Sequence, residues 1–350
     1  VETVKATLYG ALQDANANAT FYTWDMENDT TWKGGATLQA GSLISSALDH
    51  RTGNVVVMDG TTHDFHVVDP STGKDLATYP GIDGHGGFNV PVYDMECSQV
   101  FSTGDKPTMF SLYSFMIFTP APLGELQSKG FVMFMELFQN TGADKFTAVT
   151  SCGATKMDLD GDGTEETDAE LFLVLDNKGY VWTMKLYQQD GEYKLDYKAS
   201  RTNLSSYKLY FMGDDNGNPD CSMVAATENG KLVLYLSYLA KTTSQIYRMV
   251  YDSTSNSWNA DFIADFGENV FPATVYALDS HTKADLSTVA KADLPVCDHT
   301  VGTQPITEET YRMNAQTASA GSLSAVGGTP AEGGKVTLLS AEAAPAASSN

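Results

Sequence analysis

The sequence contains no apolar run long enough to cross a bilayer, because a spanning helix needs about 18 consecutive apolar residues. The longest candidate, Thr108 to Phe118, is too short. Helical periodicity is almost absent, and no G-x-S-x-G, H-E-x-x-H, Walker or dinucleotide-binding fingerprint occurs. We therefore expect no membrane span and none of the enzyme classes that these motifs mark.

Cysteine is scarce, and its four positions are widely spaced with no C-x-x-C motif, which excludes a standard zinc knuckle. The residues are Cys97, Cys152, Cys221 and Cys297. The spacing leaves zero, one or two disulfides open, and among the pairings we favour Cys97 with Cys152.

Basic residues are few, since 21 Lys and Arg stand against 44 Asp and Glu, for a formal net charge of -23. Such a field repels phosphate backbones and anionic membrane surfaces. Nucleic acid is therefore excluded as a partner, and cations are favoured.

What the sequence does contain is β-structure, because short runs of strand-forming residues ending in Gly, Asn and Asp turns recur over the first 280 residues. Five segments share the form strand, polar turn, strand, and a repeat of roughly 40 to 60 residues is typical of propellers and solenoids. These segments begin at Ala19, His63, Phe131, Tyr180 and Gln245.

The repeats predict an all-β, five-bladed β-propeller over residues 1–285, with the five segments as outer hairpins. The first unit lacks a leading strand, and "FPATVYALDS" from Phe271 has no hairpin after it. A closed ring explains both, because the last segment then pairs with the N-terminal strand inside one blade and removes the exposed edges. A surplus strand near "SYKLYFMGDDNGNPD" leaves a sixth blade open, and a pair of β-sandwiches is the alternative fold. Residues 286–350, rich in Ala, Ser, Gly and Pro, are predicted to form an extended tail or linker to further domains.

Acidic residues alternate in "KMDLDGDGTEETDAELFLVL", from Lys156 to Leu175, just before an apolar strand. Calcium takes six to eight oxygen ligands, and ligands at alternate positions with glycine near the sixth wrap one ion. The twelfth position, which holds a bidentate Glu in an EF-hand, is Ala169 here, so the loop is not an EF-hand. The alternative is a solvated acidic turn, since DG and NG are ordinary hairpin residues.

The D-x-D-G-D-G pattern followed by acid and an apolar strand resembles the FG-GAP or VCBS repeats of integrin alpha-chain propellers and bacterial surface proteins. The resemblance implies a Ca2+ ion held between the first two strands of a blade, with a structural role. "GDDNGNPDCSMV" resembles the same repeat, shortened by two residues. The implied ligands are Asp158, Asp160, Asp162, Thr164, Glu166 and Asp168 in the first loop, and Asp214, Asn216, Asn218 and Asp220 in the second.

Asp49, Asp94 and Asp279 end presumed innermost strands, as Asp158 does, so channel carboxylates of a glycoside hydrolase are one interpretation. The other is that each Asp starts a turn and bonds its own backbone. His63 and His66 are expected to point to opposite faces of a strand and to share no metal.

The long insertion from Thr119, "TPAPLGELQSKG", is the best candidate for a recognition loop, and the clustered aromatics are expected to pack between blades. The chain opens with "VETVKATLYG", without a Met or a basic-then-apolar leader, which is typical of an exported protein after signal-peptide removal. We therefore expect a secreted or cell-surface, calcium-stabilised module that binds a protein or glycan. The alternatives are a glycoside hydrolase and a structural spacer in a larger surface protein.

Overall fold

The computed structural model describes most of the predicted β region. The described residues are 6–13, 18–39, 43–48, 52, 54–59, 65–79, 98–101, 108–111, 116–119, 127–132, 146–155, 169–176, 179–189, 192–204, 221–240, 243–266, 279–280, 284–295, 297 and 299–304. The elements in these ranges are strands and two short 3-10 helices, so the all-β prediction is confirmed. No helix among these residues has the length and apolar character that crossing a membrane requires.

Twenty strands of the described residues form five units of four, and within each unit neighbouring strands pair antiparallel. The remaining strand and a short parallel pairing join three of these units into one 13-stranded sheet. The first unit contains, in order of pairing, β20 (Asp279–Ser280), β1 (Thr7–Gln13), β2 (Asn18–Asp25) and β3 (Lys33–Gln39). The second contains β4 (Leu43–Leu48), β5 (Val55–Asp59), β6 (Phe65–Asp69) and β7 (Lys74–Tyr79). The third contains β8 (Ser98–Phe101), β9 (Thr108–Ser111), β10 (Met116–Thr119) and β11 (Gln127–Val132).

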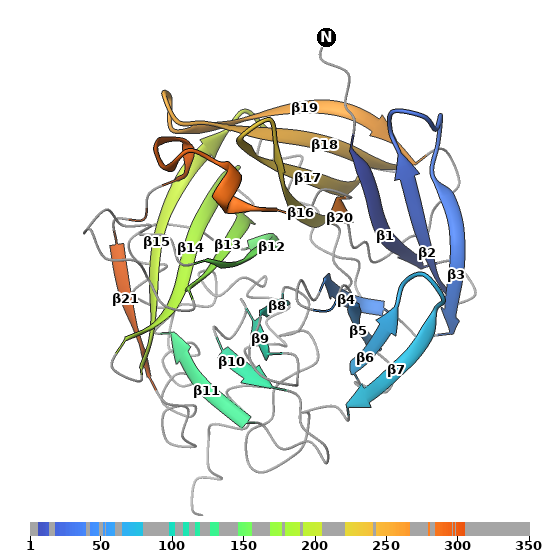
Figure 1. Cartoon of the computed structure of the whole chain (residues 1–350), viewed down its shortest axis with the longest axis horizontal. Coiled ribbons are helices and arrows are strands. Elements are labelled where there is room, and N and C mark those ends of the chain that lie inside the picture. The colour runs from blue at the N-terminus through green and yellow to red at the C-terminus, as the bar shows by residue number, and fades with distance from the viewer. Residues whose placement is uncertain are drawn as a thin grey trace, which may run out of the picture.

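The two remaining units have the longest strands. The fourth contains β12 (Phe146–Thr155), β13 (Ala169–Asp176), β14 (Tyr180–Gln189) and β15 (Glu192–Thr202). The fifth contains β16 (Cys221–Glu228), β17 (Lys231–Ala240), β18 (Thr243–Asp252) and β19 (Ser257–Asp265). The units stand around a common axis with the first strand of each toward the centre, which is the arrangement of a β-propeller (Figure 1).

The two ends of the ring are joined by strand pairing, as the sequence predicts. β20 pairs antiparallel with β1, with Leu8 opposite Ser280 and Tyr9 opposite Asp279. The first unit thus takes its innermost strand from a segment more than 250 residues away in sequence, and no separate edge is left at that point.

Four of the five predicted outer hairpins are present, as β2–β3, β6–β7, β14–β15 and β18–β19. The segment from Phe131 is different. Phe131 and Val132 end β11, which pairs with β10, whereas Phe146 begins β12, which pairs with β13. The segment therefore connects two units, and the predicted hairpin is wrong. The sequence did not distinguish the two cases, because a hairpin and a connection between blades carry the same local pattern of strand, polar turn and strand.

The folded part continues past the predicted boundary at Asp285. Two 3-10 helices, η4 (Leu286–Thr288) and η5 (Lys291–Asp293), are followed by β21 (His299–Gln304). β21 pairs with β15 and also with β11, so it bridges the outer strands of the third and fourth units. A short parallel pairing of β15 with β19 links the fifth unit to them. Residues 305–350 lie outside the described part of the chain, so the tail stays a prediction.

The hydrophobic core lies between neighbouring units, and the fifth sheet buries both of its faces. In β17, Leu232, Leu234 and Leu236 pack in a cluster with Leu171 and Leu173 of the fourth unit. The alternate residues of the same strand, Val233 and Tyr235, pack instead with residues of the first unit. A third cluster joins the first and second units. Near-continuous apolar runs such as "KLVLYL" follow from this two-sided burial.

Aromatic side chains fill the space between the fifth and first units, as the sequence predicts. The Phe266 ring meets Tyr22 edge to face, with centroids 5.0 Å apart, and lies near Trp24 and Trp32. The Trp32 indole N–H donates to the Phe266 carbonyl oxygen at 2.9 Å. This aromatic cluster supports the junction at which the ring closes.

Cys152 and Cys297 are buried thiols. The Cys297 thiol lies 3.6 Å from the Thr183 carbonyl oxygen, to which it donates. Cys97 lies outside the described residues, so the structure gives the Cys97–Cys152 pairing no support.

The aromatic cluster yields a prediction. Phe266→Ala should lower the free energy of unfolding by about 3–5 kcal/mol, because Phe266 is 2% exposed and its removal leaves a cavity between units. Phe262→Ala is the control, since Phe262 is 53% exposed on the same stretch of chain and should cost less than about 1 kcal/mol. Urea denaturation measures both, and equal losses would contradict the assignment of Phe266 to an inter-unit core.

Candidate functional site

The candidate site is one face of the ring, and the meander topology defines it. In an antiparallel meander, successive turns lie at opposite ends of the sheet. The turns between first and second strands and between third and fourth strands therefore share one face, which we call the hairpin face. The connections between units emerge on the other face. Loop residues on scaffolds of this kind carry function because the strands hold their ends rigidly.

The acidic loop belongs to the hairpin face. It occupies residues 156–168, between β12 and β13, the first two strands of the fourth unit. Thr155 and Ala169 are direct partners across the two strands, so the loop's ends are only about 5 Å apart. The strand that follows is anchored in the core, with Leu171 and Leu173 almost fully buried.

This geometry places all six implied ligands of the first site on a loop with closely spaced ends. Asp158, Asp160, Asp162, Thr164, Glu166 and Asp168 themselves lie outside the described residues. Carboxylate and carbonyl oxygens from such a loop are the donors that a hard cation prefers. Within the described ranges no group of three or more His, Cys, Asp or Glu residues is suitably placed for a metal ion.

The predicted recognition loop also lies on the hairpin face. It is shorter than the insertion suggests, because Gln127 to Gly130 belong to β11, and the connection from β10 comprises residues 120–126. The third and fourth units are neighbours, joined through β21. The recognition loop and the acidic loop thus emerge from adjacent units on the same face.

The second acidic loop has a different position. Residues 205–220 connect β15, the outer strand of the fourth unit, to β16, the inner strand of the fifth. Such a connection emerges on the face opposite the hairpin face. Asp214, Asn216, Asn218 and Asp220 lie outside the described residues, and the topology separates them from the first loop.

The candidate catalytic carboxylates do not occupy equivalent positions along their strands. Asp49 follows the end of β4, whereas Asp94 precedes the start of β8, and both lie outside the described residues. The backbone of Asp279 pairs with that of Tyr9 in the closing strand β20. The described residues bring no pair of these carboxylates together.

Of the two histidines at positions 63 and 66, the structure describes His66. His66 Nδ1 in β6 donates to Asp75 Oδ2, 2.6 Å away on β7, and Thr78 Oγ1 donates to the same carboxylate at 3.1 Å. His63 lies outside the described residues. The His66 contacts are those of a polar surface pair between two strands.

An aspartate that begins a turn and accepts from its own backbone recurs on the hairpin face. The sequence analysis considered this role for Asp49, Asp94 and Asp279, whereas the structure shows it at other positions. Asp25, Asp69 and Asp252 each end the third strand of a unit, and each carboxylate accepts a hydrogen bond from the backbone N–H two residues on. The DPSTG and DSTSN turns carry Gly73 and Asn256 at positive φ. A Cβ at Gly73 would lie 2.7 Å from the Thr37 carbonyl oxygen, so the position demands glycine.

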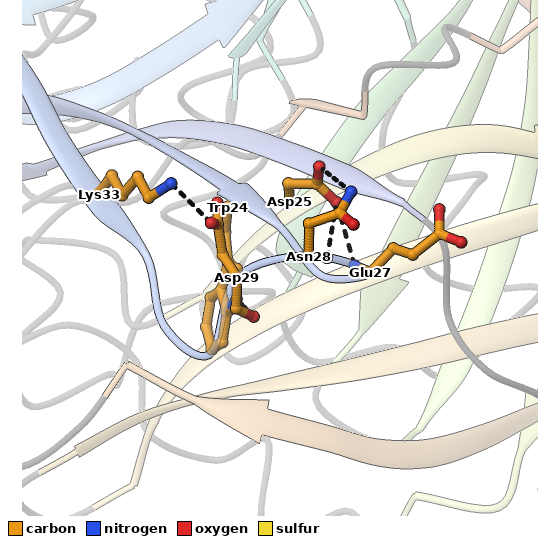
Figure 2. A network of polar contacts seen from close by, with 6 residues as sticks. All are labelled: Trp24, Asp25, Glu27, Asn28, Asp29 and Lys33. Carbon is orange, nitrogen blue, oxygen red and sulfur yellow. Dashed lines mark hydrogen bonds and ion pairs between the residues drawn. The ribbon is translucent and has the colours of Figure 1, made fainter.

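The most elaborate of these turns joins β2 to β3 (Figure 2). Asp25 accepts from the backbone N–H groups of Glu27 and Asn28 and from the Asn28 side chain at 2.7 Å. Asp29 forms an ion pair with Lys33 at 2.6 Å. These carboxylates are satisfied by groups of their own turn.

A second polar network, absent from the sequence analysis, crosses the fifth unit. Arg248 Nε and Nη2 donate to Glu228 Oε2 at 3.0 and 2.7 Å, and the Tyr235 hydroxyl donates to Glu228 Oε1. Burial, with the Glu228 carboxylate beside it, raises the pKa of Tyr235 above its ordinary value. Tyr235 and Arg248 lie opposite each other because of the register between β17 and β18. The sequence analysis could not predict this network, because it did not assign that register.

No protein-family model and no curated protein matches the chain. Among solved structures, a chain of a nidogen/laminin complex is similar at 10% identity, covering 78% of this chain and 97% of that one, with a TM-score of 0.40. Hsv2 of Kluyveromyces lactis is similar at 8% identity over 73% and 98% of the two chains, with a TM-score of 0.30. A putative exported protein of Bacteroides fragilis is similar at 12% identity over 75% and 70%, with a TM-score of 0.28.

The turn aspartates yield a pH prediction. Side-chain hydrogen bonds from Asn28, Ser71 and Ser255 lower the pKa of Asp25, Asp69 and Asp252, respectively, below the ordinary value of 3.8. Because the folded pKa is lowered, each carboxylate contributes stability that is present above pH 3.8 and is lost as the pH falls through the folded value. Carboxyl NMR titration of the folded and urea-unfolded protein measures the difference. Folded values at or above the unfolded ones would contradict the turn assignment.

Proposed function

We propose that this protein is an exported, calcium-stabilised five-bladed β-propeller that acts as a binding and adhesion module for a protein or glycan at a cell surface. The observation that carries the proposal is the emergence of the acidic loop and the recognition loop from adjacent units on the hairpin face. The first loop would hold the ion, and the second would contact the partner. A low-complexity tail would connect the ring to further domains.

The count of five blades is supported by the five four-stranded meanders and by the pairing of β20 with β1. Each meander then corresponds to one blade, and the closing strand completes the first. The segment around Ser206, which raised the question of a sixth blade, lies in the connection between the fourth and fifth units.

Calcium is supported by electrostatics. Three aspartates at alternate positions in a loop with closed ends repel one another, and a formal net charge of -23 adds to that repulsion. A divalent ion among Asp158, Asp160 and Asp162 would offset this cost, with the Thr164 carbonyl and Glu166 or Asp168 completing its oxygen shell. The turn aspartates Asp25 and Asp69 need no such ion, because neutral donors already satisfy them.

A binding role is supported by the rigidity of the scaffold. Consecutive residues of β13, such as Leu171, Phe172 and Leu173, are almost fully buried, so the strand after the acidic loop is packed on both faces. The strands that flank the recognition loop, β10 and β11, pair with each other, and β21 joins β11 to the fourth unit. Strands held in this way fix the positions at which a binding loop begins and ends. Export and a cell-surface position are supported by the resemblance of the acidic loop to the FG-GAP or VCBS repeats of surface proteins.

The calcium proposal predicts a stability difference. Calcium at a hundredfold excess over its Kd should add about 2.7 kcal/mol to the free energy of unfolding. The triple variant Asp158→Asn, Asp160→Asn, Asp162→Asn should lose that gain, and without calcium it should be more stable than the wild type because the mutual repulsion is removed. Thermal melting with calcium and with a chelator measures both effects.

Two control variants identify the site. Asp69→Asn with Asp252→Asn changes acidic turns on the same face and should keep the calcium response. Asp214→Asn with Asp220→Asn changes the loop on the opposite face and should also keep it. A response lost only in this second control would assign the ion to residues 205–220, and a chelator without effect on the wild type would refute the calcium proposal.

The binding proposal predicts that the recognition loop determines affinity for the partner. Replacing residues 120–126 by Gly and Ser at equal length should reduce binding at least about tenfold, because lost loop contacts of roughly 1.4 kcal/mol or more correspond to that factor. The probes are a printed glycan array and an array of purified extracellular proteins. Replacing Lys241 and Thr242 on the opposite face is the control and should leave binding unchanged. Unchanged binding by the loop variant, or no binding by the wild type to either array, would contradict the proposal.

A further inference from the structure

The fourth unit contains a lysine and an aspartate that face one another in its interior. Lys185 on β14 and Asp196 on β15 are direct partners in the antiparallel register, so their side chains lie on the same face of the sheet. Lys185 Nζ lies 3.0 Å from Asp196 Oδ2, and the two side chains are 0% and 3% exposed. This ion pair is the most deeply buried among the described residues.

The surroundings hold the two groups in place and keep water away. On the next strand the residue opposite Lys185 is Leu171, which is 1% exposed. On the other side β21 covers the edge of β15, with Thr300 opposite Asp196. Tyr187 contacts both members of the pair. Lys185 Nζ lies 4.8 Å from the centroid of its ring, and its hydroxyl donates to Asp196 Oδ1 at 3.2 Å.

The contact between Lys185 Nζ and Asp196 Oδ2 offers a direct path for one proton. Removing two charges from water is costly, and both side chains of this pair are held away from water. Transfer of one proton from Nζ to Oδ2 removes both charges without altering the total. The result is an uncharged amine in contact with an uncharged carboxylic acid, a nucleophile beside an electrophile at the close approach that accelerates reactions between bound groups.

We propose that Lys185 and Asp196 condense to form an intramolecular isopeptide bond. The Nζ lone pair attacks Asp196 Cγ, and a bond forms between them. The bond from Cγ to Oδ2 then breaks, and Oδ2 leaves as water with the carboxyl proton and one proton from Nζ. No oxidant, reductant or other reactant is needed. The Tyr187 hydroxyl stabilises the negative charge that develops on Oδ1 during the attack.

The bond joins the two outer strands of the meander that carries the acidic loop. The amide replaces a buried ion pair by a neutral group, and it keeps β14 and β15 attached when the surrounding packing opens. A cross-link at this position makes the fourth unit resistant to fraying from its outer edge, where β21 is the next strand along.

Mass spectrometry of the purified, denatured wild type tests the proposal. The intact mass should be lower than the sequence mass by one water molecule. Trypsin should fail to cleave after Lys185, because an acylated lysine carries no charge, and should release a branched peptide that joins residues 179–194 to residues 195–198. An intact mass equal to the sequence mass, with ordinary cleavage after Lys185, would overturn the proposal.

Two comparisons make the result specific. A cyclic imide at an aspartate also loses one water, but it leaves Lys185 open to trypsin, so full cleavage with a lowered mass would likewise overturn the proposal. Lys33 is the internal control, because its pair with Asp29 is equally close at 2.6 Å but its side chain is 68% exposed. Trypsin should cleave after Lys33 normally.

The role of Tyr187 is tested through the rate. In Tyr187→Phe the fraction of cross-linked chains at a fixed time after synthesis should fall at least tenfold, while the far-UV circular dichroism stays that of the wild type. Asp196→Ala should restore the full sequence mass expected for that variant. Equal cross-linking in Tyr187→Phe would remove the tyrosine from the proposed step, and a water loss that persists in Asp196→Ala would refute the bond itself.

Discussion

Burial of both faces of a sheet is the constraint on which this molecule depends. β17 sends alternate residues into two different cores, one shared with the fourth unit and one with the first. A sheet of this kind is stable only with a neighbour on each side, because either face alone would expose a row of leucines or of valine and tyrosine to water. A linear stack would leave two such faces bare at its ends. Ring closure removes them, and the pairing of β20 with β1 holds the ring closed.

The outer strands solve a different problem. The fourth strand of each unit is an edge, and an edge strand offers unpaired backbone groups to other chains. The chain covers part of this edge with its own later residues, since β21 pairs with both β15 and β11. Asn203 extends the short contact between β15 and β19, as its side chain accepts from Ala260 N and donates to Ala260 O. The third, fourth and fifth units are thereby linked by hydrogen bonds as well as by packing.

The acidic residues divide into two groups that sequence spacing alone does not separate. Asp25, Asp69 and Asp252 terminate strands and are satisfied by hydrogen bonds within the turns that join the third strand of a unit to the fourth. Asp158, Asp160 and Asp162 alternate within a longer loop whose ends are closed by Thr155 and Ala169. Donors of their own turns stabilise the first group, whereas the second group belongs to a longer connection between two paired inner strands.

Local patterns were sufficient for the strands and for the β2–β3, β6–β7, β14–β15 and β18–β19 hairpins, because alternation and turn residues act over a few positions. The closure of the ring was predicted from the missing strand of the first unit and the surplus strand after the last hairpin. The hairpin expected at Phe131 failed because pairing partners are chosen by distant strands: β11 meets β10 and β21, and β12 meets β13. The acidic loop was recognisable from its spacing, but its position on the same face as residues 120–126 follows only from the meander. Likewise, the Lys185–Asp196 contact follows from the register of two strands and from β21 covering the edge.

The amino-acid sequence by itself determined the β character of the chain, its strongly negative charge and the places where strands turn, because these depend on neighbouring residues and on composition. The tertiary structure decided which strands pair across units, which face each loop occupies and which charges lose their water. Those outcomes depend on burial, and burial is a property of the assembled ring rather than of any segment within it.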